Sequence, residues 1–184
     1  MFRGHTNLIT GYLMSTAAEH ALDPPAQKPG RILVVDDDAA LLVLFRSTLE
    51  RAGYKVFEAG NYRECYRVLE QEGPVDAVLL DIMLPEVNGI DILAEIIKRP
   101  DPPAAVMITG SRSVEHAVTA LKLGAYDYLT KPGDTNNTEK FVNVMSHAVN
   151  ASRAQRRINA LESALMEQQS PETVSYTHLR AHET

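Results

Sequence analysis

Short apolar runs rich in branched side chains recur between residues 31 and 130, and they predict buried β-strands. Four runs are almost wholly apolar, and we expect strands at RILVV (31–35), AVLL (77–80), AVMI (105–108) and YDYL (126–129). A fifth run, KVFEA (55–59), is more polar and is typical of a strand at the edge of a sheet.

The segments between these runs carry apolar residues at spacings of three and four, the pattern of a helix with one buried face. These positions are Leu41, Leu42, Phe45 and Leu49, then Cys65, Val68 and Leu69, then Leu93, Ile96 and Ile97, and finally Val114, Ala117, Val118 and Leu121. Asn61 and Glu64 fit a helix start in which a capping residue is followed by a returning glutamate. Strands that alternate with helices predict an α/β fold with a doubly wound parallel sheet, covered by helices on both faces.

Polar side chains follow several of the predicted strands at the point where each strand ends. They are Asp36, Asp37 and Asp38 after the first strand, Asp81 after the third, Thr109 after the fourth and Lys131 after the fifth. Each has a structural explanation when taken alone, such as a helix cap for Asp38. Ligands of such sheets bind outside the carboxyl ends of the strands, and we call this edge of the sheet the rim. The whole set of polar side chains therefore predicts a chemical site at the rim.

Carboxylates this close together repel one another and raise each other's pKa unless a cation joins them. Oxygen ligands without His or Cys nearby favour Mg²⁺ as that cation. Asp81 then becomes a candidate nucleophile, because a carboxylate can accept a phosphoryl group and form an acyl phosphate. Lys131 and Thr109 are candidates to contact the phosphoryl oxygens that the metal does not bind.

Composition and charge argue against several other classes of protein. The 184 residues, 45% hydrophobic and 23% charged, have ordinary globular composition and suffice for one domain with extensions. A net charge of −6 without a basic stripe argues against direct nucleic-acid binding. The sequence shows no membrane-spanning run and no secretory signal, so we expect a cytoplasmic protein without a membrane partner. Cys65 is the single cysteine, and we expect it to be a packed side chain.

Four motifs resemble those of the response-regulator receiver domain of two-component signalling, in register over about residues 31–150. They are ILVVDDD, DAVLLDIMLPEVNG, MITG and GAYDYLTKP. The resemblance implies a flavodoxin-like (βα)5 sheet with strand order 2-1-3-4-5. It also implies that a sensor histidine kinase or a phosphotransfer protein is the partner that phosphorylates the chain. The last motif and the residues before it are similar to receivers attached to AAA+ transcription activators.

The resemblance further assigns a role to the polar groups of the rim. The implied roles are phosphoacceptor for Asp81, metal ligand for Asp36, Asp37, Asp81 and the backbone carbonyl of Met83, phosphoryl contact for Lys131, and switch residue for Thr109 and Tyr128. The peptide bond before Pro132 is expected to be cis. Phosphorylation is then expected to reshape the surface formed by the fourth helix, the fifth strand and the fifth helix.

Three other functions compete with this interpretation. A phosphatase of the haloacid-dehalogenase type needs a second acid two residues after the nucleophile, where this chain has Met83. A flavodoxin-like nucleotide binder needs a phosphate loop after the first strand, where three aspartates would repel phosphate. A receiver-like interaction module that is never phosphorylated stays open as the alternative.

A helical pattern without Gly or Pro runs from about Thr138 to Gln168, longer than a receiver domain needs. Apolar or small residues recur in it at heptad spacing: Val144, Ala151, Ile158 and Leu165, with Ala154 and Leu161 between the later ones. The spacing fits a parallel two-stranded coil in a homodimer, and a solvated single helix fits equally well. We expect Arg153, Arg156 and Arg157 on the solvent face.

We divide the chain into a disordered extension (1–30), a receiver domain (31–150), a helical linker or weak coiled coil (151–168) and a disordered tail (169–184). The segment VSYTHLRAHET (174–184) resembles one reading frame of a transposon-end sequencing adapter, so we expect the natural gene to continue beyond about Thr173. We expect an input module that is not an enzyme, apart from Mg²⁺-dependent self-phosphorylation and dephosphorylation.

Overall fold

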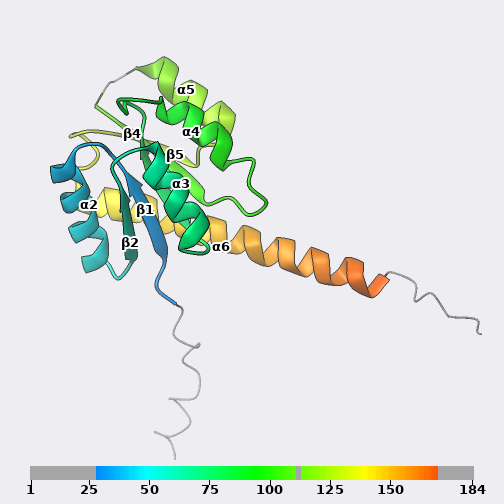
Figure 1. Cartoon of the computed structure of the whole chain (residues 1–184). Coiled ribbons are helices and arrows are strands. Elements are labelled where there is room, and N and C mark those ends of the chain that lie inside the picture. The colour runs from blue at the N-terminus through cyan, green and yellow to red at the C-terminus, as the bar shows by residue number, and fades with distance from the viewer. Residues whose placement is uncertain (1–27, 111–112, 170–184) are drawn as a thin grey trace, which may run out of the picture.

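The computed structural model describes residues 28–110 and 113–169, which form a five-stranded sheet with helices on both faces (Figure 1). Its elements are β1 (Arg31–Val35), α2 (Ala39–Arg51), β2 (Lys55–Ala59), α3 (Tyr62–Gln71), β3 (Ala77–Asp81), α4 (Gly89–Ile96), β4 (Ala104–Thr109), α5 (Val114–Leu123), β5 (Asp127–Thr130) and α6 (Thr138–Gln169). Most of the predicted extension at 1–30, nearly all of the predicted tail and the adapter-like segment lie outside the described residues.

The strand order is β2-β1-β3-β4-β5 with every neighbouring pair parallel, which confirms the predicted fold. The more polar run at 55–59 forms the edge strand β2, as its composition indicated. All five predicted strands are present, and β5 lies one residue later in the chain than predicted. Parallel pairing brings the carboxyl ends of all five strands to the same edge of the sheet.

Alternate residues of the central strands bury against different helix layers. In β1, Ile32 and Val34 face the core that α2 and α6 cover, whereas Leu33 and Val35 face the core covered by α3, α4 and α5. The strands read as continuous apolar runs because both of their faces are buried. No helix among the described residues is long and apolar enough to cross a membrane.

Two of the turns that lead out of the rim are fixed by side-chain caps. Asp38 is the N-cap of α2, and its carboxylate accepts hydrogen bonds from the amides of Ala40 and Leu41. Asn61 caps α3 through the amide of Glu64, as predicted. The returning carboxylate of Glu64 accepts from the amide of Gly60 at 2.8 Å. Asp38 is therefore engaged as a helix cap, which separates it from the neighbouring acids.

Two arginines of α6 lie against the domain, so the prediction that they face solvent is wrong. Arg153 Nη2 donates to Asp76 Oδ2 at 2.9 Å, and Arg156 Nη1 donates to Asp76 Oδ1 at 2.8 Å. Asp76 precedes β3 and is only 3% exposed, and a buried carboxylate needs such partners because an unpaired buried charge is costly. Helical periodicity distinguishes the faces of a helix without showing which distant residue meets each face. Arg157 is exposed, as predicted.

Candidate functional site

The sheet register places two buried acids side by side at the rim. Val35 pairs with Leu80, so Asp36 and Asp81 come next to each other where β1 and β3 end. Asp36 is 1% exposed and Asp81 is 5% exposed, whereas Asp37 lies exposed at the start of the turn to α2. One carboxylate oxygen from each of these three residues lies within 4.8 Å of the other two. The predicted acidic cluster is thus assembled by the register of the strands.

The ammonium group of Lys131 reaches into this cluster from the end of β5. Its Nζ donates to Oδ2 of Asp81 at 2.9 Å and forms a second, short hydrogen bond to Oδ2 of Asp36. The Lys131 backbone amide donates to the Thr109 carbonyl at 2.8 Å, which holds the lysine beside the end of β4. Burial lowers the pKa of Lys131, but the hydrogen bonds to the two carboxylates outweigh it, and the pKa is raised. Burial raises the pKa of Asp36 above its usual range.

Backbone amides hold the two buried carboxylates in place. The amide of Asp38 donates to Asp36 Oδ1 at 3.0 Å, and the amide of Met83 donates to Asp81 Oδ1 at 3.2 Å. With its three carboxylates ionised, the cluster exceeds the charge of the single Lys131 ammonium by two units. An oxygen-only donor set with surplus negative charge suits a hard divalent cation such as Mg²⁺. The residues present therefore fit the metal that the sequence predicts.

The two predicted switch residues lie at neighbouring strands beside the cluster. Thr109 is the last residue of β4 and is fully buried. Tyr128 lies on β5 opposite Met107, half-buried against the core beneath α3, α4 and α5, and burial raises the pKa of its phenol. The Met83 side chain is 59% exposed, so this residue meets the site through its backbone.

Gly89, the last residue of the DAVLLDIMLPEVNG motif, fits the loop after β3 closely against the site. A Cβ atom at this position would lie 2.0 Å from the carbonyl oxygen of Asp81. The Gly89 amide donates to the Ile82 carbonyl at 2.9 Å, which folds the loop back over the end of β3. A side chain here would push against the backbone that carries Asp81. In the sequence, Gly89 matches the loop that follows the phosphoacceptor in receiver domains, and it comes directly after the helix cap Asn88.

A further carboxylate, Asp134, fixes the loop after β5, a role that no motif in the sequence indicates. Its Oδ2 accepts from both the amide and the hydroxyl of Thr130 at 2.8 Å, and its Oδ1 accepts from Lys140 Nζ at 2.6 Å. The Lys140 ammonium, together with the Thr130 donors, lowers the pKa of Asp134 to about 2. The residues that follow β5 form a compact turn, and the bond between Lys131 and Pro132 is cis as expected.

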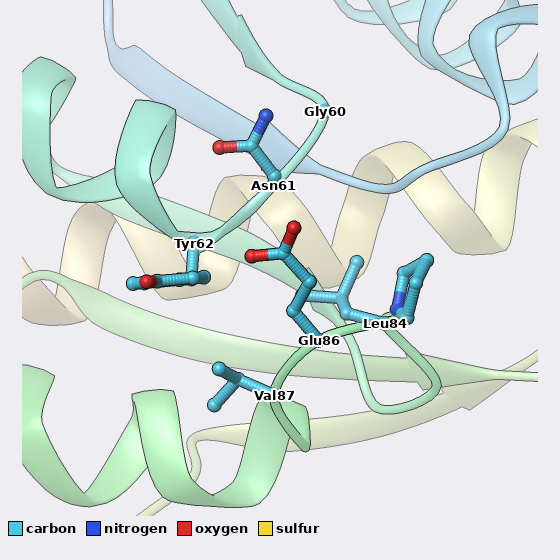
Figure 2. Close-up of a pocket in the computed structure, with 7 residues that line it drawn as sticks. Gly60, Asn61, Tyr62, Leu84, Glu86 and Val87 are labelled. Carbon is cyan, nitrogen blue, oxygen red and sulfur yellow. The ribbon is translucent and has the colours of Figure 1, made fainter.

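A cavity of about 200 Å³ opens beside the rim, between the turn after β2 and the loop after β3 (Figure 2). Its walls are Gly60, Asn61, Tyr62, Leu84, Pro85, Glu86 and Val87. Figure 2 shows the Glu86 side chain pointing from one loop toward Asn61 on the other. None of the clustered carboxylates lines this cavity. The candidate site is therefore identified by its cluster of charged groups and not by this pocket.

Comparison with known proteins gives a consistent picture. A family model for the response regulator receiver domain matches residues 32–143. The chain is 38% identical over 119 residues to a probable transcriptional regulatory protein of Picosynechococcus sp. PCC 7002, and 38% identical over 111 residues to the alginate biosynthesis regulator AlgB of Pseudomonas aeruginosa. A crystal structure of a CheY-like receiver domain protein from Methanospirillum hungatei superposes with a TM-score of 0.62 at 30% identity.

The extent of these matches differs between the relatives and the solved structure. The matched segments cover 61% and 60% of this chain, but only 47% of the cyanobacterial protein and 24% of AlgB. The chain thus spans about half or less of the length of these curated relatives. The Methanospirillum structure is matched over 98% of its own length and 69% of this chain. The similarity therefore concerns the sheet with its helices, where the acidic cluster lies.

Proposed function

Since the chain belongs to the response regulator receiver domain family, we propose that Asp81 accepts a phosphoryl group from a phosphohistidine donor and that the domain then changes its surface. The observation that carries this proposal is the convergence of Asp36, Asp37 and Asp81 with the Lys131 ammonium at one point of the rim. The donor is a sensor histidine kinase or a phosphotransfer protein. As a receiver of a two-component system, the domain serves signalling.

The reaction transfers one phosphoryl group between two nucleophiles. A carboxylate oxygen of Asp81 attacks phosphorus, the P–O bond of an acyl phosphate forms, the P–N bond to the donor imidazole breaks, and the imidazole keeps the electron pair. Asp81 is suited to this role because Met83 and Lys131 orient its carboxylate at the rim. Lys131 then compensates the negative charge on the transferred oxygens.

Asp36, Asp37, Asp81 and the backbone carbonyl of Met83 are the groups we propose for holding Mg²⁺. When bound, the ion neutralises the charge of the carboxylates and of the phosphoryl oxygens, so that an anionic donor can approach. The Asp38 amide keeps Asp36 aimed at the same point, so the ligands are positioned before the metal arrives.

The signal leaves the site through two neighbouring strands. We propose that the Thr109 hydroxyl contacts the phosphoryl group and that Tyr128 turns into the space this movement vacates. Both residues lie where β4 and β5 pair, so a shift at one strand end is passed to the surface of α5, β5 and α6. Phosphorylation shifts a population between two states, because the phosphoryl group contacts one of them better.

The relatives suggest what the domain controls. Their names describe transcriptional regulators, and this chain covers at most about half of them. We therefore propose that the segment acts as the input module of a transcriptional regulator, with its output carried by another part of the protein.

Intact-mass spectrometry after incubation with acetyl phosphate and Mg²⁺ tests the proposal. We expect the wild type to gain one phosphoryl mass that alkaline pH removes, and Asp81→Asn or omission of Mg²⁺ to prevent the gain. Asp134→Asn is the matched control, because it makes the same exchange outside the cluster and should still be labelled. Labelling of Asp81→Asn would refute the assignment. Absence of label on the wild type would favour a receiver-like interaction module that is never phosphorylated.

A further inference from the structure

The cavity beside the rim has the size of one side chain rather than that of a free ligand. Its volume is about 200 Å³, whereas pockets that hold small molecules usually measure about 300–1,000 Å³. Figure 2 shows that the turn after β2 supplies one wall and the loop after β3 supplies the other. A pocket of this size is typical of a place where one anchor side chain of a partner protein inserts.

The walls of the cavity suit a long basic side chain. Leu84, Pro85 and Val87 line it with apolar surface, on which the methylene stem of an arginine or a lysine can lie while its charged head stays in water. Among the described residues that line the cavity, Glu86 alone is charged. Its side chain is exposed and points toward Asn61 on the other wall (Figure 2). The carboxylate therefore lies where the charged head of such a side chain would end.

Tyr62, which also lines the cavity, favours arginine as the occupant. Outside the cavity, the exposed Arg63 guanidinium lies 5.3 Å from the centroid of the Tyr62 ring, and its Nε donates to the Tyr62 hydroxyl at 3.0 Å. The hydrogen bond to Tyr62 and, to a smaller extent, the charge of Glu86 raise the pKa of Arg63. These two side chains thus already attract one guanidinium group. A planar guanidinium both stacks on an aromatic ring and binds a carboxylate through two parallel hydrogen bonds, a combination that the compact ammonium of lysine lacks.

The cavity lies within the area that any protein reaching Asp81 must cover. The Asp36 amide donates to the Ala59 carbonyl at 3.1 Å, so the wall that begins at Gly60 starts beside the acidic cluster. On the other wall, Leu84 follows Asp81 by three residues, so their Cα atoms are at most about 11 Å apart. A protein interface of ordinary size covers about 800 Å² of each partner. A donor protein centred on Asp81 therefore also covers the cavity.

We propose that this cavity receives an arginine side chain of the protein that donates the phosphoryl group to Asp81, with the guanidinium bound to Glu86 and Tyr62. The inference rests on the proposed function, because phosphoryl transfer is what brings a donor protein to the rim. The arginine aligns the donor on the rim before its phosphohistidine meets Asp81. Since Glu86 lies outside the carboxylate cluster, the cavity selects among donor proteins and takes no part in the transfer itself.

An NMR titration of the isotope-labelled chain in Mg²⁺ tests the cavity without any phosphoryl donor. The probe is N-acetyl-arginine amide, and N-acetyl-citrulline amide is its neutral counterpart of the same shape. We expect only the arginine probe to shift the amide signals of Asn61 and Val87, and Glu86→Gln to weaken its binding about fivefold. Arg63→Gln removes a competing positive charge and should strengthen binding about twofold. Glu70→Gln, the same exchange at an exposed carboxylate of α3 outside the cavity, is the matched control and should bind like the wild type. Equal shifts with both probes, or undiminished binding to Glu86→Gln, would overturn the proposal.

Synthetic phosphohistidine peptides test whether the arginine belongs to the donor. Each peptide carries one phosphohistidine and, about one to six residues away on either side, an arginine or a citrulline, a range that spans the distance from Asp81 to the cavity. At one spacing or more, the arginine peptide should label the wild type about fivefold faster than its citrulline counterpart. This advantage should vanish in Glu86→Gln.

No advantage at any spacing, or an advantage that persists in Glu86→Gln, would overturn the proposal. If the arginine probe binds but no peptide labels the chain, the phosphoryl-transfer proposal fails and the assignment of the cavity to arginine does not. The two failures are therefore distinguishable.

Discussion

Both edges of the sheet hold buried carboxylates next to basic side chains, yet the two edges differ in their balance of charge. At the amino edge, the single carboxylate of Asp76 accepts from Arg153, Arg156 and the amide of Arg31. At the carboxyl edge, three carboxylates cluster, and the Lys131 ammonium group binds two of them, Asp36 and Asp81. Burial alone does not separate the two sites, because Asp76 and Asp81 are 3% and 5% exposed.

The difference teaches that surplus negative charge, and not burial, distinguishes the proposed phosphorylation site from the structural carboxylate in this molecule. The amino-edge carboxylate has donors at both oxygens, so a ligand would have to displace protein partners. At the carboxyl edge, the negative charge of the carboxylates exceeds the positive charge of Lys131, and an additional cation would compensate the excess. Removing the ion-pair partner at the amino edge should therefore lower the stability of the fold. Adding a divalent cation at the carboxyl edge should raise it.

The largest expected effect is that of Asp76→Ala at the amino edge. Removing one member of a buried ion pair leaves Arg153 and Arg156 without their partner, and we expect a loss of about 3–5 kcal/mol in the free energy of unfolding. Urea denaturation monitored by circular dichroism measures it. Asp76→Asn, which keeps an acceptor oxygen, should lose less.

Asp101→Ala is the control for this experiment, because it also removes a carboxylate that contacts α6, but an exposed one. Its cost should stay within about 0.5 kcal/mol. Equal losses in Asp76→Ala and Asp101→Ala would show that the buried network contributes no more than a surface contact does.

Much of the sheet and of the rim could be predicted, because the apolar runs and the polar residues that end them are adjacent in the sequence. A run such as RILVV becomes a strand because both of its faces are buried, and a polar residue at its end must then lie at the rim. The parallel register brings these ends together without further information. Asp36, Asp37 and Asp81 are for this reason the three acids that the structure assembles.

The amino-edge network could not be predicted, because its partners are distant in the sequence and have no repeated pattern. Asp76 and Arg156 are 80 residues apart, and either one alone reads as an ordinary charged surface residue. The close contact at Gly89 and the role of Asp134 could not be predicted for a related reason. Their roles follow from a backbone oxygen and a hydroxyl that only the folded chain places beside them.

The second prediction concerns the effect of Mg²⁺ at the carboxyl edge. On the proposal that Mg²⁺ binds the folded cluster and not the unfolded chain, Mg²⁺ at about one hundred times its dissociation constant should add about 2.7 kcal/mol to the free energy of unfolding. Urea denaturation with and without Mg²⁺ measures the gain. Asp37→Asn should lose most of it, whereas Asp76→Asn at the other edge should keep it. An undiminished gain in Asp37→Asn would remove this residue from the metal site.

The third prediction concerns the close packing of the loop after β3 against the backbone of Asp81. Gly89→Ala would drive a methyl group against the Asp81 carbonyl, and such overpacking costs about 1–3 kcal/mol. We also expect slower phosphorylation by acetyl phosphate, because the backbone of Asp81 must shift. Gly110→Ala is the matched control at the same rim, since a Cβ there meets no atom within 4 Å. Equal effects of the two exchanges would contradict the close fit.

The smallest expected effect belongs to Asp134, whose one carboxylate faces one ammonium at a more exposed position than either buried cluster. Its pKa is lowered to about 2 from 3.8, so the folded state favours the ionised form. The stability it contributes is therefore complete above about pH 4 and is lost as the pH falls toward 2. Because solvent screens this pair, we expect Asp134→Asn to cost about 1 kcal/mol or less at neutral pH.

Urea denaturation of the wild type and of Asp134→Asn at neutral pH and between about pH 4 and pH 2 tests this sign. The difference in unfolding free energy between the two proteins should shrink as the pH falls, since protonation removes the same charge that the exchange removes. A constant difference would mean that Asp134 stabilises the turn through its hydrogen bonds to Thr130 alone, with no contribution from Lys140. In that case, charge balance would matter only where the carboxylates are buried, as at the two edges of the sheet.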